Sequence, residues 1–186
     1  MKENDLLGNL VQKSKKNDNA AFTKLILIFK NDLYKIAKMR LNCEDDIEDA
    51  VQDTIIQAYK NIKKLRNNKY FKTWIIKILI NNCNKTYKKL CKEKKLENIE
   101  ELTTTSYYIS DEENIKNLDF YILIKNLNYK ERTSLTLYYL MEFTTKEISK
   151  ILKEPEPTIR SRLSRAKLKL KKMYEEDKNE QNRKVN

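Results

Sequence analysis

The sequence predicts an all-α fold made of two small helical domains that are joined by a flexible acidic linker. Three observations lead to this expectation. The chain of 186 residues contains one glycine and two prolines, so tight turns and hairpins have almost no raw material. Apolar residues recur at the spacing of amphipathic helices. Charged residues are segregated, with two basic stretches on either side of an acidic one.

The charge segregation predicts how the chain is organised. The chain has 39 basic and 27 acidic residues, a formal net charge of +12. Residues 60–95 contain 13 bases and one acid, residues 160–172 contain seven bases and no acid, and residues 96–119 hold seven acids and one base. Basic stretches of this kind most often face polyanions. The expected parts are a first domain at 1–95, an acidic linker at 96–114, a second domain at 115–174 and a polar tail at 175–186, frayed from Glu175 onward.

The composition also excludes whole classes of chemistry. Without histidine the chain cannot build a Ser-His-Asp or Cys-His relay, or a zinc site that needs imidazole. Its single glycine, Gly8, cannot supply a phosphate-binding glycine-rich loop. Cys43, Cys83 and Cys91 form no C-x-x-C pattern, which favours reduced thiols in a cytosolic protein. We expect no catalytic residues, no cofactor and no metal. We also expect a soluble, cytoplasmic protein, because neither a signal peptide nor an apolar run of about 20 residues is evident.

Two amphipathic segments dominate the first half of the chain. Apolar spacing over 21–41 predicts one or two helices with an ordinary core face. The segment from Asp45 to Ile62 has an apolar stripe on one side and acids at i, i+4 and i+8 on the other. We call this second face the acidic ridge, and it comprises Asp45, Glu48, Asp49, Gln52 and Asp53.

The acidic ridge is open to three interpretations. A solvated face is the ordinary one, but the unmixed sign of the charge makes a basic partner plausible. The third is a magnesium site of a nuclease or phosphohydrolase, held by Asp45, Glu48, Asp49 and Asp53. We disfavour it because two-metal sites normally gather carboxylates from several elements, and no second acidic helix is evident.

Residues 71–90 are predicted to form a further amphipathic helix in which aromatic and basic residues interleave. Phe71 and Trp74 stand at i and i+3, so we expect both rings to be buried on one face with Ile75 and Ile78. The alternative for the aromatic residues is stacking on unpaired bases, which contributes about 1 to 3 kcal/mol for each base. Lysines and asparagines surround the rest of this helix.

The second domain carries the spacing of a helix-turn-helix. Two short helices are predicted at 115–127 and 129–141, and a third begins at Thr144, which forms a capping box with Glu147. A fourth helix opens at the Glu-Pro-Glu-Pro stretch, because proline is tolerated in a first helical turn. A capped helix, a short turn and a basic helix are typical of DNA binding. Along the fourth helix we expect Ile159, Leu163, Ala166 and Leu170 to face inward and Thr158, Arg160, Ser161, Arg162, Ser164, Arg165 and Lys169 to stay outside.

Taken together, these residues resemble the extracytoplasmic-function (ECF) group of bacterial RNA polymerase sigma factors, within the sigma-70 family. The resemblance covers residues 20–92 and 115–173. It implies a region 2 helical bundle followed by a region 4 helix-turn-helix. The stretch DDIEDAVQDTIIQAY, residues 45–59, is similar to the family's helix that docks on the clamp coiled coil of the polymerase β′ subunit. By this resemblance the contacts to core polymerase are Asp49, Gln52 and Asp53.

Two further stretches resemble the family's promoter-binding segments. FKTWIIKILINN, residues 71–82, is similar to the helix and loop that melt the −10 element and hold a flipped base, with Asn81 at the readout position. The −10 set implied is Trp74, Lys77, Asn81, Asn84, Lys85 and Lys88. EISKILKEPEPTIRSRLSRAKLKL, residues 147–170, resembles the −35-binding helix-turn-helix. The −35 set implied is Thr158, Arg160, Ser161, Arg162, Ser164, Arg165 and Lys169.

Three residues depart from the family pattern around the turn. Lys153 stands where the family often has glycine, Ser149 replaces the usual small alanine, and Pro157 replaces another common glycine. The first two predict a slightly strained or reshaped turn. Proline at 157 is tolerated, because it lies in a first helical turn.

The resemblance implies an alternative sigma factor rather than an enzyme, with no small-molecule substrate. Its partners would be core RNA polymerase, through the β′ clamp helices and the β flap, and promoter DNA at −35 and −10. Residues 96–118 would thread the polymerase channels near the active centre. Family members are commonly held inactive by an anti-sigma factor, often membrane-anchored, and the resemblance implies such a partner here. The alternative function is a free-standing helix-turn-helix regulator, which usually binds as a symmetric dimer and leaves the acidic ridge unexplained.

Overall fold

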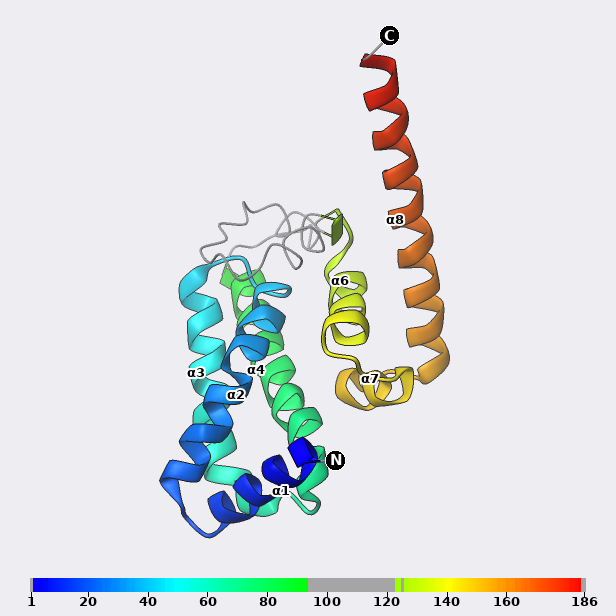
Figure 1. Cartoon of the computed structure of the whole chain (residues 1–186). Helices are drawn as coiled ribbons and strands as arrows, with labels where there is room; N and C mark the ends of the chain where they lie inside the picture. The colour runs from blue at the N-terminus through cyan, green and yellow to red at the C-terminus, as the bar shows by residue number, and fades with distance from the viewer. Residues whose placement is uncertain (1, 94–122, 125, 185–186) are drawn as a thin grey trace. The chain divides into compact units, whose positions relative to one another are not determined.

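The computed structural model of the chain describes residues 2–93, 123–124 and 126–184, and over these residues it contains helices and turns but no strand. The chain divides into two compact units. Helices α1 to α4 lie in the N-terminal unit, and α6, α7 as far as Ser149 and α8 lie in the C-terminal unit (Figure 1). The predicted all-α, two-domain fold is therefore confirmed. The predicted linker at 96–114 and most of the predicted helix at 115–127 lie outside the described residues.

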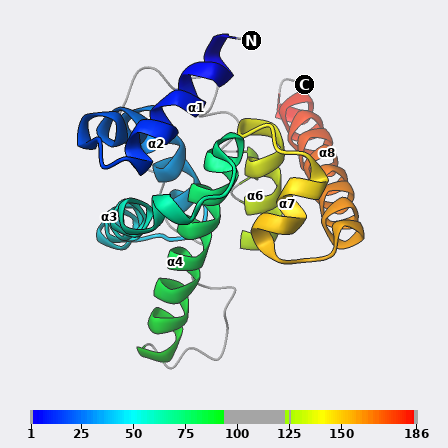
Figure 2. The ribbon, with the colours of Figure 1, turned by 90° about the horizontal axis from the view of Figure 1, so that it is seen from below.

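The N-terminal unit is a bundle whose long helices are joined by short connections. Its elements are α1 (Lys2–Lys15), α2 (Asn19–Lys38), α3 (Glu44–Asn61), the 3-10 turns η1 (Ile62–Lys64) and η2 (Asn68–Tyr70), and α4 (Phe71–Glu93). Asp18 caps α2, because its carboxylate accepts a 2.9 Å hydrogen bond from the amide of Ala21. Helix α3 packs against both α2 and α4, as the two views show (Figures 1 and 2).

The core of this unit is filled from all its long helices. Its largest fully buried side chains are Leu25, Leu33, Ile36, Met39, Ile47, Phe71, Ile75, Ile76 and Leu79. The rings of Phe29 and Phe71, 5.5 Å apart between centroids, join α2 to α4. Helix α1, which packs against α2, was missed at the sequence level. A signal for it exists in the helical spacing of Leu7, Leu10, Val11 and Ser14, of which Val11 and Ser14 are buried.

The C-terminal unit contains the predicted helix-turn-helix. Helix α6 (Tyr129–Leu135) continues as the π-helical turn η5 (Thr136–Leu140), and α7 (Thr145–Leu152) and α8 (Glu156–Lys184) follow. The capping box at the start of α7 is confirmed: the Glu147 amide donates to Thr144 Oγ1 at 3.3 Å, and the Thr144 amide donates to Glu147 Oε2 at 3.0 Å. On α8, Ile159, Leu163 and Ala166 are buried as predicted.

Helix α8 is longer than predicted. It continues through Lys184 as one helix instead of fraying from Glu175 (Figure 1). The physical reason is local: the sequence EEDKNEQNRK contains neither glycine nor proline and is rich in residues with good helix propensity.

Candidate protein and nucleic-acid interfaces

The acidic ridge lies on the exposed side of α3, as predicted. All five of its residues are exposed, whereas the opposite side of α3 is buried through Ile47, Ala50, Val51, Thr54 and Ala58. Among the side chains that the structure describes between residues 6 and 90, no basic group forms an ion pair with the ridge. Ile56 extends the same face by one turn beyond Gln52 and Asp53 and is 42% exposed. The face thus offers a partner carboxylates, an amide and an uncovered aliphatic side chain, of which sequence reasoning overlooked the last.

The carboxylates of the ridge follow one another along a single helix. At spacings of i, i+4 and i+8 they lie about one turn apart and point outward in a row. Among the side chains that the structure describes, no group of three or more His, Cys, Asp or Glu residues is placed to hold a metal ion.

The buried face of α4 is rotated from the one that the sequence predicted. Phe71 and Ile75 are fully buried as expected, but Trp74 and Ile78 are only half-buried. The core instead takes Ile76, Leu79 and Ile80, because α4 is covered on two sides, by α2 and by α3. The buried face of α4 is shared between α2 and α3, and Trp74 and Ile78 lie at its margin, where neither helix covers them fully. The expectation that Trp74 is a core residue was therefore wrong, and its ring, 5.9 Å from that of Phe71, lies at that margin.

The six predicted −10 residues form one stripe along the uncovered side of α4. Trp74, Lys77, Asn81, Asn84, Lys85 and Lys88 recur every three or four residues, and none is buried. Lys85 and Lys88 are exposed, while Asn81 is half-buried. The Asn84 side-chain oxygen accepts a hydrogen bond from Arg40 Nη2, so this asparagine is held in place from the end of α2. The stripe joins an indole, amide groups and ammonium groups on one rigid helix.

A buried polar network ties α4 to α3 directly behind this stripe. Asn82 is 3% exposed, donates to Thr54 Oγ1 at 3.0 Å and accepts from Gln57 Nε2 at 3.0 Å. The Thr54 hydroxyl in turn donates to the Ala50 carbonyl at 2.7 Å. Next to Asn82, burial raises the pKa of the Cys83 thiol to about 11. Sequence reasoning missed this network because two adjacent asparagines, 81 and 82, look equivalent without knowledge of which one faces α3.

Six of the seven predicted −35 residues are exposed on α8. They are Thr158, Arg160, Ser161, Ser164, Arg165 and Lys169. Arg160 pairs with Glu156 at 2.8 Å, and Glu156 also accepts a 2.7 Å hydrogen bond from Thr145. These two interactions, that of Thr145 first, lower the pKa of Glu156 below its ordinary value. Lys169 Nζ forms an ion pair with the buried Glu131 of α6 at 2.8 Å, so part of its charge is neutralised within the unit.

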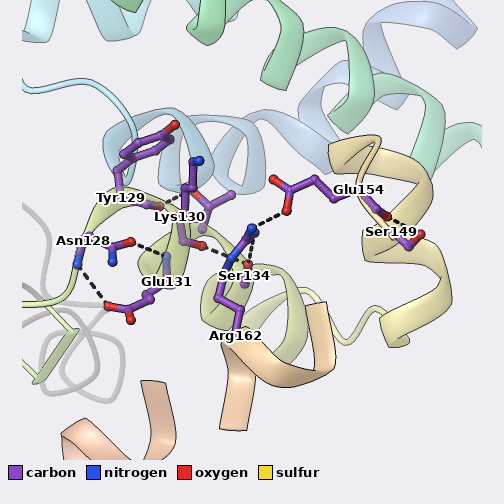
Figure 3. Close-up of polar contacts among 9 residues, drawn as sticks. Asn128, Tyr129, Lys130, Glu131, Ser134, Ser149, Glu154 and Arg162 are labelled. Carbon is purple, nitrogen blue, oxygen red and sulfur yellow. Dashed lines mark hydrogen bonds and ion pairs between the residues drawn. The ribbon is translucent and has the colours of Figure 1, made fainter. Parts of the chain in front are cut away.

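The seventh, Arg162, contradicts the prediction that it lies on the outer face. Its side chain is 10% exposed, against 69% for Arg160. It forms an ion pair with Glu154 in the turn, and its Nη1 donates to Ser134 Oγ of α6 at 3.2 Å (Figure 3). Position 162 follows the buried Ile159 by three residues, so on an α-helix it lies at the margin of the core face. The long side chain turns inward there because an acid and a hydroxyl are available as partners.

The turn between α7 and α8 has the left-handed residue that its sequence suggested. Lys153 has φ +57°, a conformation that favours glycine. Ser149 compensates with two hydrogen bonds across the turn: its carbonyl accepts from the Glu154 amide at 3.1 Å, and its hydroxyl donates to the Glu154 carbonyl at 2.6 Å (Figure 3). The hydroxyl of Ser149, which an alanine would lack, thus adds a hydrogen bond that stabilises a turn without glycine.

A cation–aromatic cluster on the C-terminal unit had no counterpart in the sequence prediction. Lys167 Nζ lies 5.5 Å from the ring centroid of Tyr138 and 5.3 Å from that of Tyr139. A hydrogen bond with Tyr139 raises the pKa of Lys167. This base is therefore directed toward η5, so the count of seven bases between residues 160 and 172 overstates the charge available to an outside partner.

Comparison with known proteins gives matches to both units. Residues 25–91 match the family described as Sigma-70 region 2, and residues 119–170 match the one described as Sigma-70, region 4. RNA polymerase sigma factor SigV of Bacillus subtilis is 28% identical over 154 residues, which cover 83% of this chain and 91% of that protein. ECF RNA polymerase sigma factor SigW of the same organism is 28% identical over 182 residues, with coverage of 90% and 96%.

Two solved structures share the fold. The sigma factor RpoE in complex with the anti-sigma factor NepR from Bartonella quintana superposes with a TM-score of 0.69 at 22% identity, covering 83% of this chain and 96% of that one. CnrH in complex with the cytosolic domain of CnrY gives a TM-score of 0.67 at 17% identity, with coverage of 92% and 99%. None of the helices in the described part of this chain is long and apolar enough to cross a membrane.

Proposed function

The chain belongs to the ECF group of the sigma-70 family of RNA polymerase sigma factors, and from this premise we propose which of its surfaces make each contact of a sigma factor. As an alternative sigma factor it binds core RNA polymerase and directs transcription initiation at specific promoters. We assign the polymerase and −10 contacts to a domain at 1–95 and the −35 contacts to a domain at 115–174, with an acidic linker at 96–114 and a polar segment from 175. Its role is binding rather than catalysis, and its place of action is the cytoplasm.

The polymerase contact is assigned to the exposed face of α3. Asp49, Gln52 and Asp53 are exposed and offer two carboxylates and an amide. Ile56, one turn further along the helix, adds an exposed apolar side chain. A face of this kind suits a basic helical partner, because opposite charges steer the encounter and the aliphatic side chain contributes burial. The β′ clamp helices are the partner that we assign to it, with the β flap meeting the C-terminal unit.

The −10 contact is assigned to the stripe on α4. Trp74 presents an aromatic surface for stacking, Asn81 has amide groups for reading a base edge, and Lys77, Lys85 and Lys88 carry positive charge for phosphates. An unpaired, flipped base needs this combination of stacking and hydrogen bonding. Asn84 contributes from a position that Arg40 fixes.

The −35 contact is assigned to the exposed face of α8. Arg160 and Arg165 suit guanine edges and phosphates, and Thr158, Ser161 and Ser164 can donate to either. Lys169 contributes at the periphery, since it is shared with Glu131. A modest affinity at each element suffices, because the linker makes the second engagement intramolecular.

We further propose control by an anti-sigma factor that covers these same surfaces. Support comes from the two similar structures, each solved in complex with another protein, named as an anti-sigma factor in the RpoE structure. Such a partner competes with polymerase for the acidic ridge. A membrane-anchored form would release this chain on a signal received outside the cell.

The observation that carries the assignment is the pairing of an uncovered acidic ridge on α3 with a Trp–Asn–Lys stripe on the adjoining α4. The test is run-off transcription from fragmented genomic DNA of the source organism, using purified core polymerase with and without the protein. We expect discrete new start sites that appear only with the protein and share −35 and −10 sequences. DNA binding in a gel shift without any new start would instead favour a free-standing helix-turn-helix regulator.

A further inference from the structure

Arg162 lies on the helix that we assign to DNA, yet its guanidinium group faces the interior of the unit. Two other elements meet it there, as Figure 3 shows: Glu154 in the turn after α7 and Ser134 on α6. Ser134 is fully buried, and its hydroxyl also donates to the Lys130 carbonyl at 2.8 Å. One side chain thus links the backbone of α6, the helix-turn-helix turn and α8.

The guanidinium group of Arg162 requires its acceptors to lie at fixed positions around it. A guanidinium group is a planar fork with five donors, so it fixes the relative orientation of the groups that accept from it. Here Nη1 and Nη2 are directed to different partners on different elements. Glu154 is itself held to Ser149 through two hydrogen bonds, so movement at one end is transmitted to the other. The Arg162 guanidinium is largely buried and the Glu154 carboxylate partly so, and loss of either member leaves the other charge without its partner.

We propose that Arg162 is a positioning residue, which sets the placement of the exposed face of α8 through Glu154 and Ser134 and does not touch DNA. This inference rests on the assignment of α8 to the −35 element. The competing role for Arg162, a direct contact to a phosphate or a guanine, requires it to leave Glu154 when DNA binds.

The two roles predict opposite effects for the Glu154→Gln substitution. If Arg162 contacts DNA, loss of the acid frees the arginine and removes a negative charge near the duplex, so DNA affinity stays equal or rises. If Arg162 positions α8, loss of the acid loosens the helix, and DNA affinity falls. Glu154 makes no contact that would hide this difference, since its remaining hydrogen bonds are made by its backbone.

The experiment measures binding of a labelled promoter duplex, mapped by the run-off assay, to the full-length protein assembled with core polymerase, over a series of salt concentrations. For Glu154→Gln we expect an affinity lower by about tenfold, with the slope against log salt unchanged, because no phosphate contact is lost. Affinity equal to or above that of the wild type would overturn the proposal.

Arg162 and Arg165 serve as a matched pair on the same helix. Arg165→Ala is expected to reduce the salt slope by about one, as removal of a phosphate contact does. Arg162→Ala should lower affinity without that change in slope, and the double variant Arg162→Ala with Glu154→Gln should be no weaker than Arg162→Ala alone. A reduced slope for Arg162→Ala, or additive losses in the double variant, would contradict positioning.

The exposed Lys171–Glu175 pair, also on α8, controls for the general effect of losing an acid on this helix. Glu175→Gln should not lower affinity. Circular dichroism checks each fold, and if Arg162→Ala fails to fold, Glu154→Gln and Ser134→Ala decide the question. Failure of the proposed function is recognised separately, because wild-type protein would then give no promoter-specific binding with core polymerase. In that case the sign of the Glu154→Gln effect is still read from binding of the free protein to duplex DNA.

Discussion

The side-chain amide of Asn82 on α4 donates a 3.0 Å hydrogen bond to the hydroxyl of Thr54 on α3, at a point where both residues are buried. The two helices carry different surfaces, the acidic ridge on α3 and the Trp–Asn–Lys stripe on α4. A hydrogen bond made in a dry interface fixes how the helices are rotated against each other more strictly than apolar packing does. The surfaces of the N-terminal unit that we assign to polymerase and to −10 DNA are therefore held in a fixed relative orientation.

Replacing Thr54 by valine should destabilise the N-terminal unit by about 1 to 3 kcal/mol, because the Asn82 amide is then buried without this acceptor. The measurement is urea unfolding followed by the fluorescence of Trp74, the single tryptophan of the chain. The double variant Thr54→Val with Asn82→Leu should recover part of the loss, because the buried Asn82 amide is gone, while Gln57 Nε2, which loses its acceptor, lies in a side chain that is only half-buried. Equal stability of Thr54→Val and the wild type would show that the bond contributes little.

Substituting Asp53 by lysine should weaken binding to core polymerase at least tenfold and leave the fold intact. The side chain is exposed on the acidic ridge, where a single charge contributes little to stability. Affinity is measured by titrating labelled protein with core polymerase, and helicity by circular dichroism. Lys24→Glu, an exposed change on α2, is the control and should bind normally. A large loss of helicity in Asp53→Lys would instead make this residue structural.

Trp74 should report directly on single-stranded DNA. Because the indole is half-buried at the edge of α4, stacking of a base on it should change its emission. The chain is produced with 5-hydroxytryptophan at position 74, which can be excited apart from the tryptophans of core polymerase. The holoenzyme is then titrated with a single-stranded oligonucleotide of the −10 sequence, and an oligonucleotide of equal length without that sequence is the comparison. Identical fluorescence changes with the two oligonucleotides would argue against a specific contact near this ring.

Lys153→Gly should stabilise the turn between α7 and α8 by up to about 1 kcal/mol, because the left-handed backbone of Lys153 is strained for a residue with a side chain. Native-state hydrogen exchange of amides in α7 and α8 measures the gain. Lys150→Gly within α7 is the matched control, and it should cost about 1 kcal/mol. If both glycine variants lose stability equally, the turn is relaxed with lysine in place.

The two described cysteines should differ sharply in reactivity. Cys43 is exposed, whereas Cys83 is buried and its pKa is raised to about 11. Near pH 8 iodoacetamide should therefore modify Cys43 readily and leave Cys83 unmodified in the folded protein, as peptide mass spectrometry can show. The raised pKa also means that Cys83 contributes stability below its ordinary value of 9.0, which is lost as pH rises toward 11. Rapid native labelling of Cys83 would reveal frequent opening of α4.

Much of this architecture could be predicted from one-dimensional patterns. The acidic ridge on α3 and the capped start of α7 depend only on helical spacing and local hydrogen bonding, and both were placed correctly. The strain at Lys153 was also predictable, because a lysine stood where a turn needs a left-handed residue.

The errors arose where a helix touches more than one neighbour. Trp74 was misplaced because periodicity fixes the middle of a buried face but not its width, and α4 is covered by both α2 and α3. Arg162 was misplaced because a long cation at the edge of a face can turn either way. The partners that decide its direction, Glu154 and Ser134, lie 8 and 28 residues away in the sequence.

The inward turn of Arg162 bears on the design of chimeric transcription factors with altered promoter preference. A graft limited to α8, the helix that we assign to the −35 element, would transfer Arg162 without its two partners, Ser134 and Glu154. A graft that includes Arg162 should therefore also include Ser134 and Glu154. Alternatively, position 162 keeps the residue of the recipient protein. New promoter preference is then sought by diversifying Thr158, Ser161, Ser164 and Arg165, whose side chains are exposed.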